Sequence, residues 1–311
     1  MTRIELYIIK SKPIQAIIKW LKSIRPYGFQ GVSLFDSLNF FRKEIFESRF
    51  NSRANAVSFS FLMALPPLLL FFFTLIPYLP LPETKILQVL NDMLQLLSPS
   101  DKIKKSISNI ITDFIQHKKT VLLSFSVLLT LFYSSNGMMG LMHSFEKQMP
   151  GFKKRTGFKQ RLLAIALTFL LIISLLLTLV LMLIQAWLAN GLEMDFLKDA
   201  LVLKIFAYLL IVFMCFMIVS ILYRYGPATL YRMPLVSPGS VIATVLIISL
   251  TFIFFYAVNN LINYDKIYGS IGTLIIFLIW INFMAQILLI GFELNASIIV
   301  NRKSKFKIEK A

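Results

Sequence analysis

The stretch from Tyr268 to Ser297 constrains the fold of this chain more than any other part of it. It contains 22 consecutive uncharged residues, 271–292, which end at a single carboxylate, Glu293. A helix of that length rises roughly 33 Å, about the thickness of the hydrocarbon core of a bilayer. The sequence therefore predicts a transmembrane helix over residues 271–292.

The polar residues of this helix lie on one stripe. At 100° per residue, Asn282, Gln286 and Glu293 fall within about 40° of one another. Polar side chains are unfavourable on a helix face that contacts lipid, so we expect the stripe to face protein or a wet cavity. These three residues are candidates for a substrate pathway.

Further apolar runs predict five more spans, at about 54–79, 120–142, 162–188, 205–223 and 239–259. The composition agrees, because 57% of the residues are hydrophobic and only 15% are charged, which is far from a soluble domain. The predicted fold class is an all-α, polytopic membrane protein with six transmembrane helices.

Three segments lie outside these spans. Residues 1–53 are expected to form a cytoplasmic, interfacial region of two basic amphipathic helices. Residues 80–119 are predicted to be an amphipathic loop over the outer end of the bundle, and whether it is a lid or a structural cap stays open. Residues 301–311 form a basic cytoplasmic tail, and residues 54–300 form the transmembrane domain.

The net charge of +17 reflects membrane topology rather than nucleic-acid binding. If six spans place both termini on one side, 23 of the 32 Lys and Arg residues lie on that side. The positive-inside rule then places both termini in the cytoplasm. No basic module with interleaved aromatic residues points to RNA or DNA.

The expected partners are therefore membrane lipids, with anionic headgroups at the basic region 1–53. The sequence leaves the oligomeric state open. Two histidines and one cysteine are too few to suggest a metal site, and no cofactor is expected.

Two more features of the spans are candidates for the substrate pathway. Pro66 and Pro67 lie near the middle of the first span, where they remove backbone donors, so they predict either an opened helix beside a cavity or a packed kink. In the second span Asn136 begins a small, polar ridge with Gly140 and Ser144, which would allow close helix contact.

Several motifs resemble the YihY/BrkB family, once mislabelled as ribonuclease BN. They are YGSIG at residues 268–272, LLIGFELNA at 288–296, Arg53-Ala54-x-Ala56, Tyr223-Arg224-x-x-Pro227 and Pro238-Gly239-Ser240. The resemblance covers roughly residues 40–300. It implies a six-helix inner-membrane protein, and export or flipping of lipid-like molecules has been proposed for some relatives. Relatives usually have an Asn where this chain has Glu146.

Three functions follow from these features. The first is transport or flipping of a lipid-like or amphipathic molecule, and the second is a non-catalytic membrane scaffold or envelope-assembly factor. The third, a membrane enzyme such as a nuclease or protease, lacks HExxH and GxSxG motifs and paired intramembrane carboxylates, so we expect no catalytic residues.

The carboxylate at the end of the polar stripe needs a positively charged partner. Glu293 stands at the C-terminal end of its apolar run, where a negative charge is unfavourable without a partner. Arg224, which ends the fourth span on the same side, is the expected partner in a structural ion pair, and Arg53 is the second choice.

Overall fold

The computed structural model describes residues 12–26, 28–46, 48–78, 109, 112–113, 120–146, 151–153, 155–191, 200–230, 232–260 and 270–308. Their secondary structure is helical, which confirms the predicted fold class. The elements are α2 (Lys12–Ser23), α3 (Leu34–Ile45), α4 (Ser48–Leu75), the short η1 (Ile76–Tyr78), α7 (Thr120–Ser144), α8 (Gly157–Gly191), α10 (Ala200–Tyr225), α11 (Pro238–Asn260) and α13 (Ser270–Ile308).

Five of these helices are long and apolar enough to cross a membrane. The qualifying stretches are Arg49–Leu75, Val121–Ser144, Gly157–Thr178, Tyr208–Tyr225 and Ile275–Arg302. A shorter apolar stretch, Pro238–Phe254, lies in α11 at the place of the predicted span 239–259. The chain is thus a polytopic helical membrane protein, and the sixth crossing remains a prediction.

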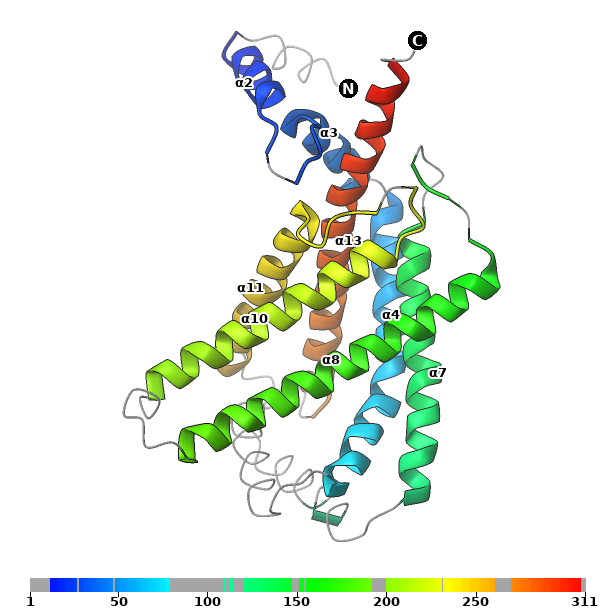
Figure 1. Ribbon diagram of the computed structural model, residues 1–311, viewed down its shortest axis with the longest axis vertical. Coiled ribbons are helices and arrows are strands. Elements are labelled where there is room, and N and C mark those ends of the chain that lie inside the picture. The colour runs from blue at the N-terminus through cyan, green and yellow to red at the C-terminus, as the bar shows by residue number, and fades with distance from the viewer. Residues whose placement is uncertain are drawn as a thin grey trace.

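The long helices form two groups (Figure 1). Helices α4 and α7 run side by side, α13 packs along α4, and α11 packs along α13. Helices α8 and α10 form a pair that crosses this group obliquely. The crossing brings the pair close to the group at one end of the bundle.

The densest core lies where the second half of α13 meets its neighbours. Phe292 stacks on Phe145 with ring centroids 4.3 Å apart, and Tyr223 meets Phe145 edge-on at 6.0 Å. All three rings are buried. Aromatic pairs in these geometries add stabilisation beyond their buried area. This core fixes α7, α10 and α13 relative to one another.

Helix α13 continues well past its predicted end at residue 292, as one helix of 39 residues. Its extension has no Gly or Pro after Gly291 that would stop it. It also has an apolar face, because Leu294 and Ile298 are buried against Phe29 and Val32 next to α3. The predicted tail at residues 301–311 therefore begins as helix.

The two amphipathic helices predicted within residues 1–53 are present as α2 and α3. Ser33 caps α3, because its Oγ accepts a hydrogen bond from the Asp36 backbone N–H at 3.1 Å. Of the predicted amphipathic loop 80–119, only residues 109 and 112–113 lie within the described part of the chain.

Candidate functional site

Helices α4 and α7 pack closely where α7 carries small residues. A Cβ atom on Gly140 would lie 2.6 Å from Ser60 Oγ, and one on Gly137 would lie 3.3 Å from the Ser60 carbonyl oxygen. The predicted ridge therefore does permit close helix contact at Gly140. Asn136 points elsewhere, because its side chain is exposed and its Oδ1 accepts a hydrogen bond from Arg161 Nη1.

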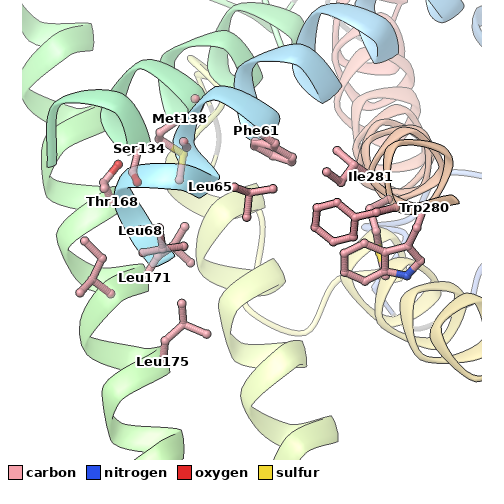
Figure 2. A pocket seen from close by; sticks show the side chains of 15 residues that line it. Phe61, Leu65, Leu68, Ser134, Met138, Thr168, Leu171, Leu175, Trp280 and Ile281 are labelled. Carbon is pink, nitrogen blue, oxygen red and sulfur yellow. The ribbon is translucent and has the colours of Figure 1, made fainter. Parts of the chain in front are cut away.

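Two adjoining hollows lie between the oblique pair and the rest of the bundle, and we call them together the bundle cavity. The first, of about 300 Å³, lies between α4, α7, α8 and α13 and is partly open to the outside. The second, of about 340 Å³, extends to α10 and α11. Both are lined by Phe61, Met138, Leu171 and Leu175. Figure 2 shows these side chains converging on the first hollow from different helices.

The wall of the first hollow is apolar except for a few groups. Thr168 and Trp280 are among its lining residues. Thr168 Oγ1 and Trp280 Nε1 are buried, and neither has a hydrogen-bond partner among the described residues. A buried polar group left without a partner costs about 1–3 kcal/mol. Both atoms are inaccessible from the hollow, so the surface that a bound molecule would meet is almost entirely apolar.

The two prolines do not break the first span. Helix α4 runs without interruption through Pro66 and Pro67, so the opened helix that we predicted is wrong. The two prolines remove the helical donors of the carbonyls of residues 62 and 63. Helix α7 contacts this part of α4 through Thr130 Oγ1, which donates to the Pro67 carbonyl at 2.7 Å. The cavity wall is formed by neighbouring residues of α4, such as Leu65 and Leu68, and not by the prolines.

The polar stripe of α13 faces α4, where it forms what we call the polar seam: Asn55, Ser58, Asn282 and Gln286. Asn282 Nδ2 donates to Asn55 Oδ1 at 2.9 Å and to Ser58 Oγ at 3.2 Å. Gln286 Nε2 donates to Asn282 Oδ1 at 2.7 Å. The stripe therefore faces protein, as its spacing predicted.

Glu293 is paired, and its partner is Arg53. The carboxylate Oε1 lies 2.8 Å from Arg53 Nη2, with the Glu293 side chain fully buried and the Arg53 side chain 21% exposed. Arg53 Nη1 also donates to the Ser144 carbonyl at 3.1 Å. One arginine of α4 thus connects the buried acid of α13 to the C-terminal end of α7.

The prediction that Arg224 is the partner of Glu293 is wrong. The Arg224 guanidinium instead lies over the ring of Tyr225, 5.7 Å from its centroid. The physical reason is the arrangement of the helices, because α13 packs along α4 for much of its length but contacts α10 only slightly. Arg53, the second choice, stands on the helix that is adjacent.

The sequence reasoning missed how α11 is held against α13. Asn295 Oδ1 accepts from the Gly239 backbone N–H at 3.0 Å, and its Nδ2 donates to Ser237 Oγ at 3.0 Å. Tyr223 adds a hydrogen bond from its hydroxyl to the Leu288 carbonyl at 2.7 Å. The sequence signal for this contact was Asn295, which lies two residues after Glu293 on the same helix as Asn282 and Gln286.

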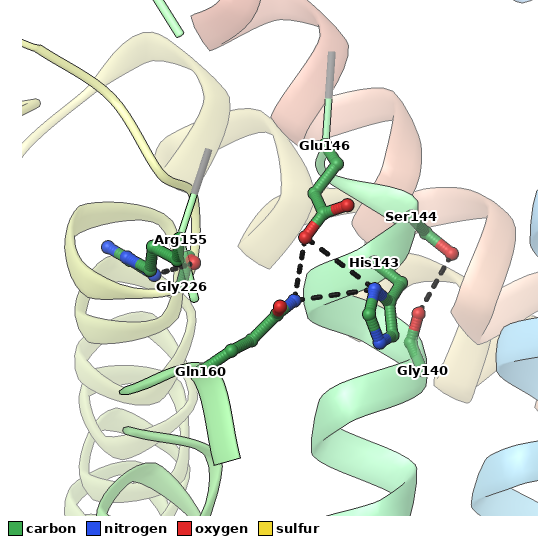
Figure 3. Close-up of polar contacts among 7 residues, drawn as sticks. All are labelled: Gly140, His143, Ser144, Glu146, Arg155, Gln160 and Gly226. Atoms are coloured by element: carbon green, nitrogen blue, oxygen red, sulfur yellow. Dashed lines mark hydrogen bonds and ion pairs between the residues drawn. The ribbon is translucent and has the colours of Figure 1, made fainter. Parts of the chain in front are cut away.

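A second polar cluster lies at the C-terminal end of α7 (Figure 3). Gln160 Nε2 donates to Glu146 Oε1 at 2.7 Å and lies 3.3 Å from His143 Nδ1. His143 Nδ1 is also 3.5 Å from Glu146 Oε1. Glu146, where relatives were expected to carry Asn, therefore ties the ends of α7 and α8 together.

The fold and the cavity define a class of protein: a polytopic helical membrane protein whose helices leave a partly open apolar cavity between them. The chain belongs to the family described as "Virulence factor BrkB", which matches residues 41–311. That match confirms the family resemblance of its motifs.

One relative is similar over most of its length. "Putative ribonuclease-like protein YfkH" of Bacillus subtilis (strain 168) is 30% identical over 271 residues, which cover 82% of this chain and 94% of YfkH. No solved structure matches the chain significantly.

Proposed function

We propose that this protein moves a lipid-like, amphipathic molecule across the bacterial cytoplasmic membrane. The observation that carries the proposal is the bundle cavity, whose apolar walls are built from residues of α4, α7, α8, α10, α11 and α13. Apolar walls suit the acyl chains of a lipid. Each hollow alone falls at the small end of the range for ligand sites, about 300–1,000 Å³.

The polar seam lies next to this cavity. Ile281 and Met284 line the first hollow and flank Asn282 of the seam along α13. None of the four seam residues is among the residues that line the two hollows, and the seam amides are hydrogen-bonded within the protein. We therefore place the apolar chains of an amphipathic substrate in the hollows and its polar head outside them.

A substitution that fills the cavity tests the proposal. Leu171→Trp would place a larger side chain where the two hollows meet, so we expect the purified protein to lose most of its co-purifying lipid, measured by native mass spectrometry. Leu170→Trp is the matched control, because Leu170 is the adjacent leucine of α8, 37% exposed and absent from both linings. Equal lipid retention by both variants would contradict a lipid in the cavity.

We further propose that both termini are cytoplasmic, as the charge distribution favours. Single cysteines at Thr156 and Asn109, in a Cys215→Ser background, should respond differently to an impermeant thiol reagent added to intact cells. Both positions are exposed. Position 109 should be labelled and position 156 should not. The reverse pattern would invert the topology.

We also propose that the chain is not an enzyme, although the printed name of YfkH contains the words "ribonuclease-like". Within the described residues, no group of three His, Cys, Asp or Glu side chains could share a metal ion. Glu293, the buried carboxylate of α13, is engaged by Arg53. Because this pairing occupies Glu293, the carboxylate is not available as a general base, which supports a role in binding rather than in hydrolysis.

A membrane scaffold is the second candidate. The observation that favours it is the polar seam, in which Asn282 and Gln286 are hydrogen-bonded within the protein. A scaffold would need the seam for packing and would have no use for the cavity. The same Leu171→Trp variant separates the two functions. If the protein is a scaffold, filling the cavity should leave its function in the cell unchanged.

A further inference from the structure

Two linkers are joined at the ends of α7, α8 and α10. The Lys153 backbone N–H donates to the Ala228 carbonyl at 2.7 Å, and the Leu230 N–H donates to the Gly151 carbonyl at 2.8 Å. These bonds flank an isolated antiparallel bridge between Phe152 and residue 229. The linker after α10 is therefore held in a defined position.

Arg155 secures the end of α10 (Figure 3). Its Nη1 donates to the Gly226 carbonyl at 2.8 Å, and its Nη2 donates to the carbonyls of Tyr225 and Pro227 at 3.2 and 3.0 Å. A cation is favourable at a helix C-terminus, where carbonyl groups lack helical partners. Burial and the nearby charge of Arg232 lower the pKa of the Arg155 guanidinium, and Glu146 acts in the opposite direction.

Two more guanidinium groups gather around Tyr225. The Arg232 and Arg224 guanidinium carbons lie 5.4 and 5.7 Å from the centroid of its ring. Arg224 Nε is buried without a hydrogen-bond partner among the described residues. We call Arg155, Arg224, Arg232 and Tyr225 the arginine cluster.

No carboxylate in the described part of the chain forms an ion pair with the arginine cluster. The recorded pairs join Glu293 to Arg53 and Glu146 to His143. The like charges of Arg155 and Arg232 repel one another, and Glu146 acts on Arg155 in the opposite direction. An anion beside Arg232 would relieve this repulsion further. Guanidinium groups match phosphate oxygens well, because they donate two parallel hydrogen bonds.

The position of the arginine cluster indicates which kind of molecule supplies that anion. The apolar stretch of α10 ends at Tyr225, so the cluster lies where a membrane helix meets the headgroup layer. The linker beside it exposes Leu230, Leu235 and Val236, which offer apolar surface at the same level. A free phosphate ion has no apolar part that could contact these side chains.

We infer that the arginine cluster binds the phosphate group of an anionic phospholipid, through Arg224 and Arg232, at the end of α10. Arg155 positions the linker that carries Arg232 and adds charge. The site is separate from the bundle cavity, whose lining contains none of these residues. It does not depend on the proposed transport, and a lipid bound here need not be the substrate.

Native mass spectrometry of the full-length protein in detergent tests this site. Phosphatidylglycerol is titrated against phosphatidylcholine, and the apparent Kd is compared among wild type, Arg224→Gln and Arg232→Gln. Losing one charged hydrogen-bond donor should weaken phosphatidylglycerol binding about tenfold while phosphatidylcholine binding is unchanged. Arg232 is exposed, so its substitution should leave the fold intact.

Lys159→Gln is the charge-matched control, because Lys159 is exposed at the start of α8 and lies outside the cluster. It should bind phosphatidylglycerol like the wild type. Wild-type affinity in Arg232→Gln, or the same loss in Lys159→Gln, would overturn the site. If inorganic phosphate alone displaces phosphatidylglycerol from the wild type, the ligand is a free phosphate and the lipid assignment is wrong.

Discussion

Glu293→Gln is expected to cause one of the largest losses of stability that a single substitution in this protein can produce. Glu293 is fully buried, and its carboxylate is 2.8 Å from Arg53 Nη2. Removing one partner of a buried ion pair leaves the other charge uncompensated and typically costs about 3–5 kcal/mol. The loss should appear as a lower midpoint of unfolding in detergent, followed by tryptophan fluorescence.

A double-mutant cycle identifies the partner. Arg53→Gln combined with Glu293→Gln should cost less than the two single losses together, with a coupling of about 1–3 kcal/mol. Arg224→Gln combined with Glu293→Gln should be additive within about 0.5 kcal/mol, because Arg224 lies over Tyr225. Coupling in the Arg224 cycle and additivity in the Arg53 cycle would reverse this assignment.

Gly291→Ala is expected to disrupt the crossing of α11 and α13. A Cβ atom on Gly291 would lie 2.7 Å from the Gly239 carbonyl oxygen and 2.8 Å from Ala243 Cβ, and it would also collide with the Tyr223 hydroxyl. Backbone atoms cannot rotate away as a flexible side chain can. Overpacking usually costs about 1–3 kcal/mol, and we expect the upper end of that range here.

Thermal unfolding in detergent measures this effect, with Gly157→Ala as the control. A Cβ atom on Gly157 would meet nothing within 4 Å, so this variant should unfold like the wild type. Gly239→Ala should resemble Gly291→Ala, because its Cβ would lie 2.6 Å from Asn295 Cγ. Equal midpoints for Gly291→Ala and Gly157→Ala would show that the crossing is looser than this structure has it.

The sequence predicted the features that depend on local periodicity. Apolar runs located the long helices, and the 100° spacing of Asn282 and Gln286 correctly predicted that they face protein. The close contact at Gly140 also followed from residue size alone. Each of these inferences needs only one helix and its own side chains.

Features that depend on which helices are adjacent were not predictable in this way. Arg224 and Arg53 have the same charge and the same expected depth in the membrane, so the sequence made them nearly equivalent partners for Glu293. Only the packing of α13 along α4 shows that the partner is Arg53. The break expected at Pro66 and Pro67 does not occur, and the packing of α7 along α4 could not be inferred from the sequence of α4 alone. The bundle cavity likewise requires the oblique pair, α8 and α10.

Lipid movement in reconstituted vesicles tests the proposed function most directly. Vesicles would carry a fluorescent phospholipid in both leaflets, and dithionite would quench only the accessible outer leaflet. Wild-type protein should increase the quenched fraction above that of protein-free vesicles, Leu170→Trp should match it, and Leu171→Trp should abolish the increase. A quenched fraction equal to that of protein-free vesicles, with and without an imposed proton gradient and membrane potential, would contradict lipid translocation by this protein.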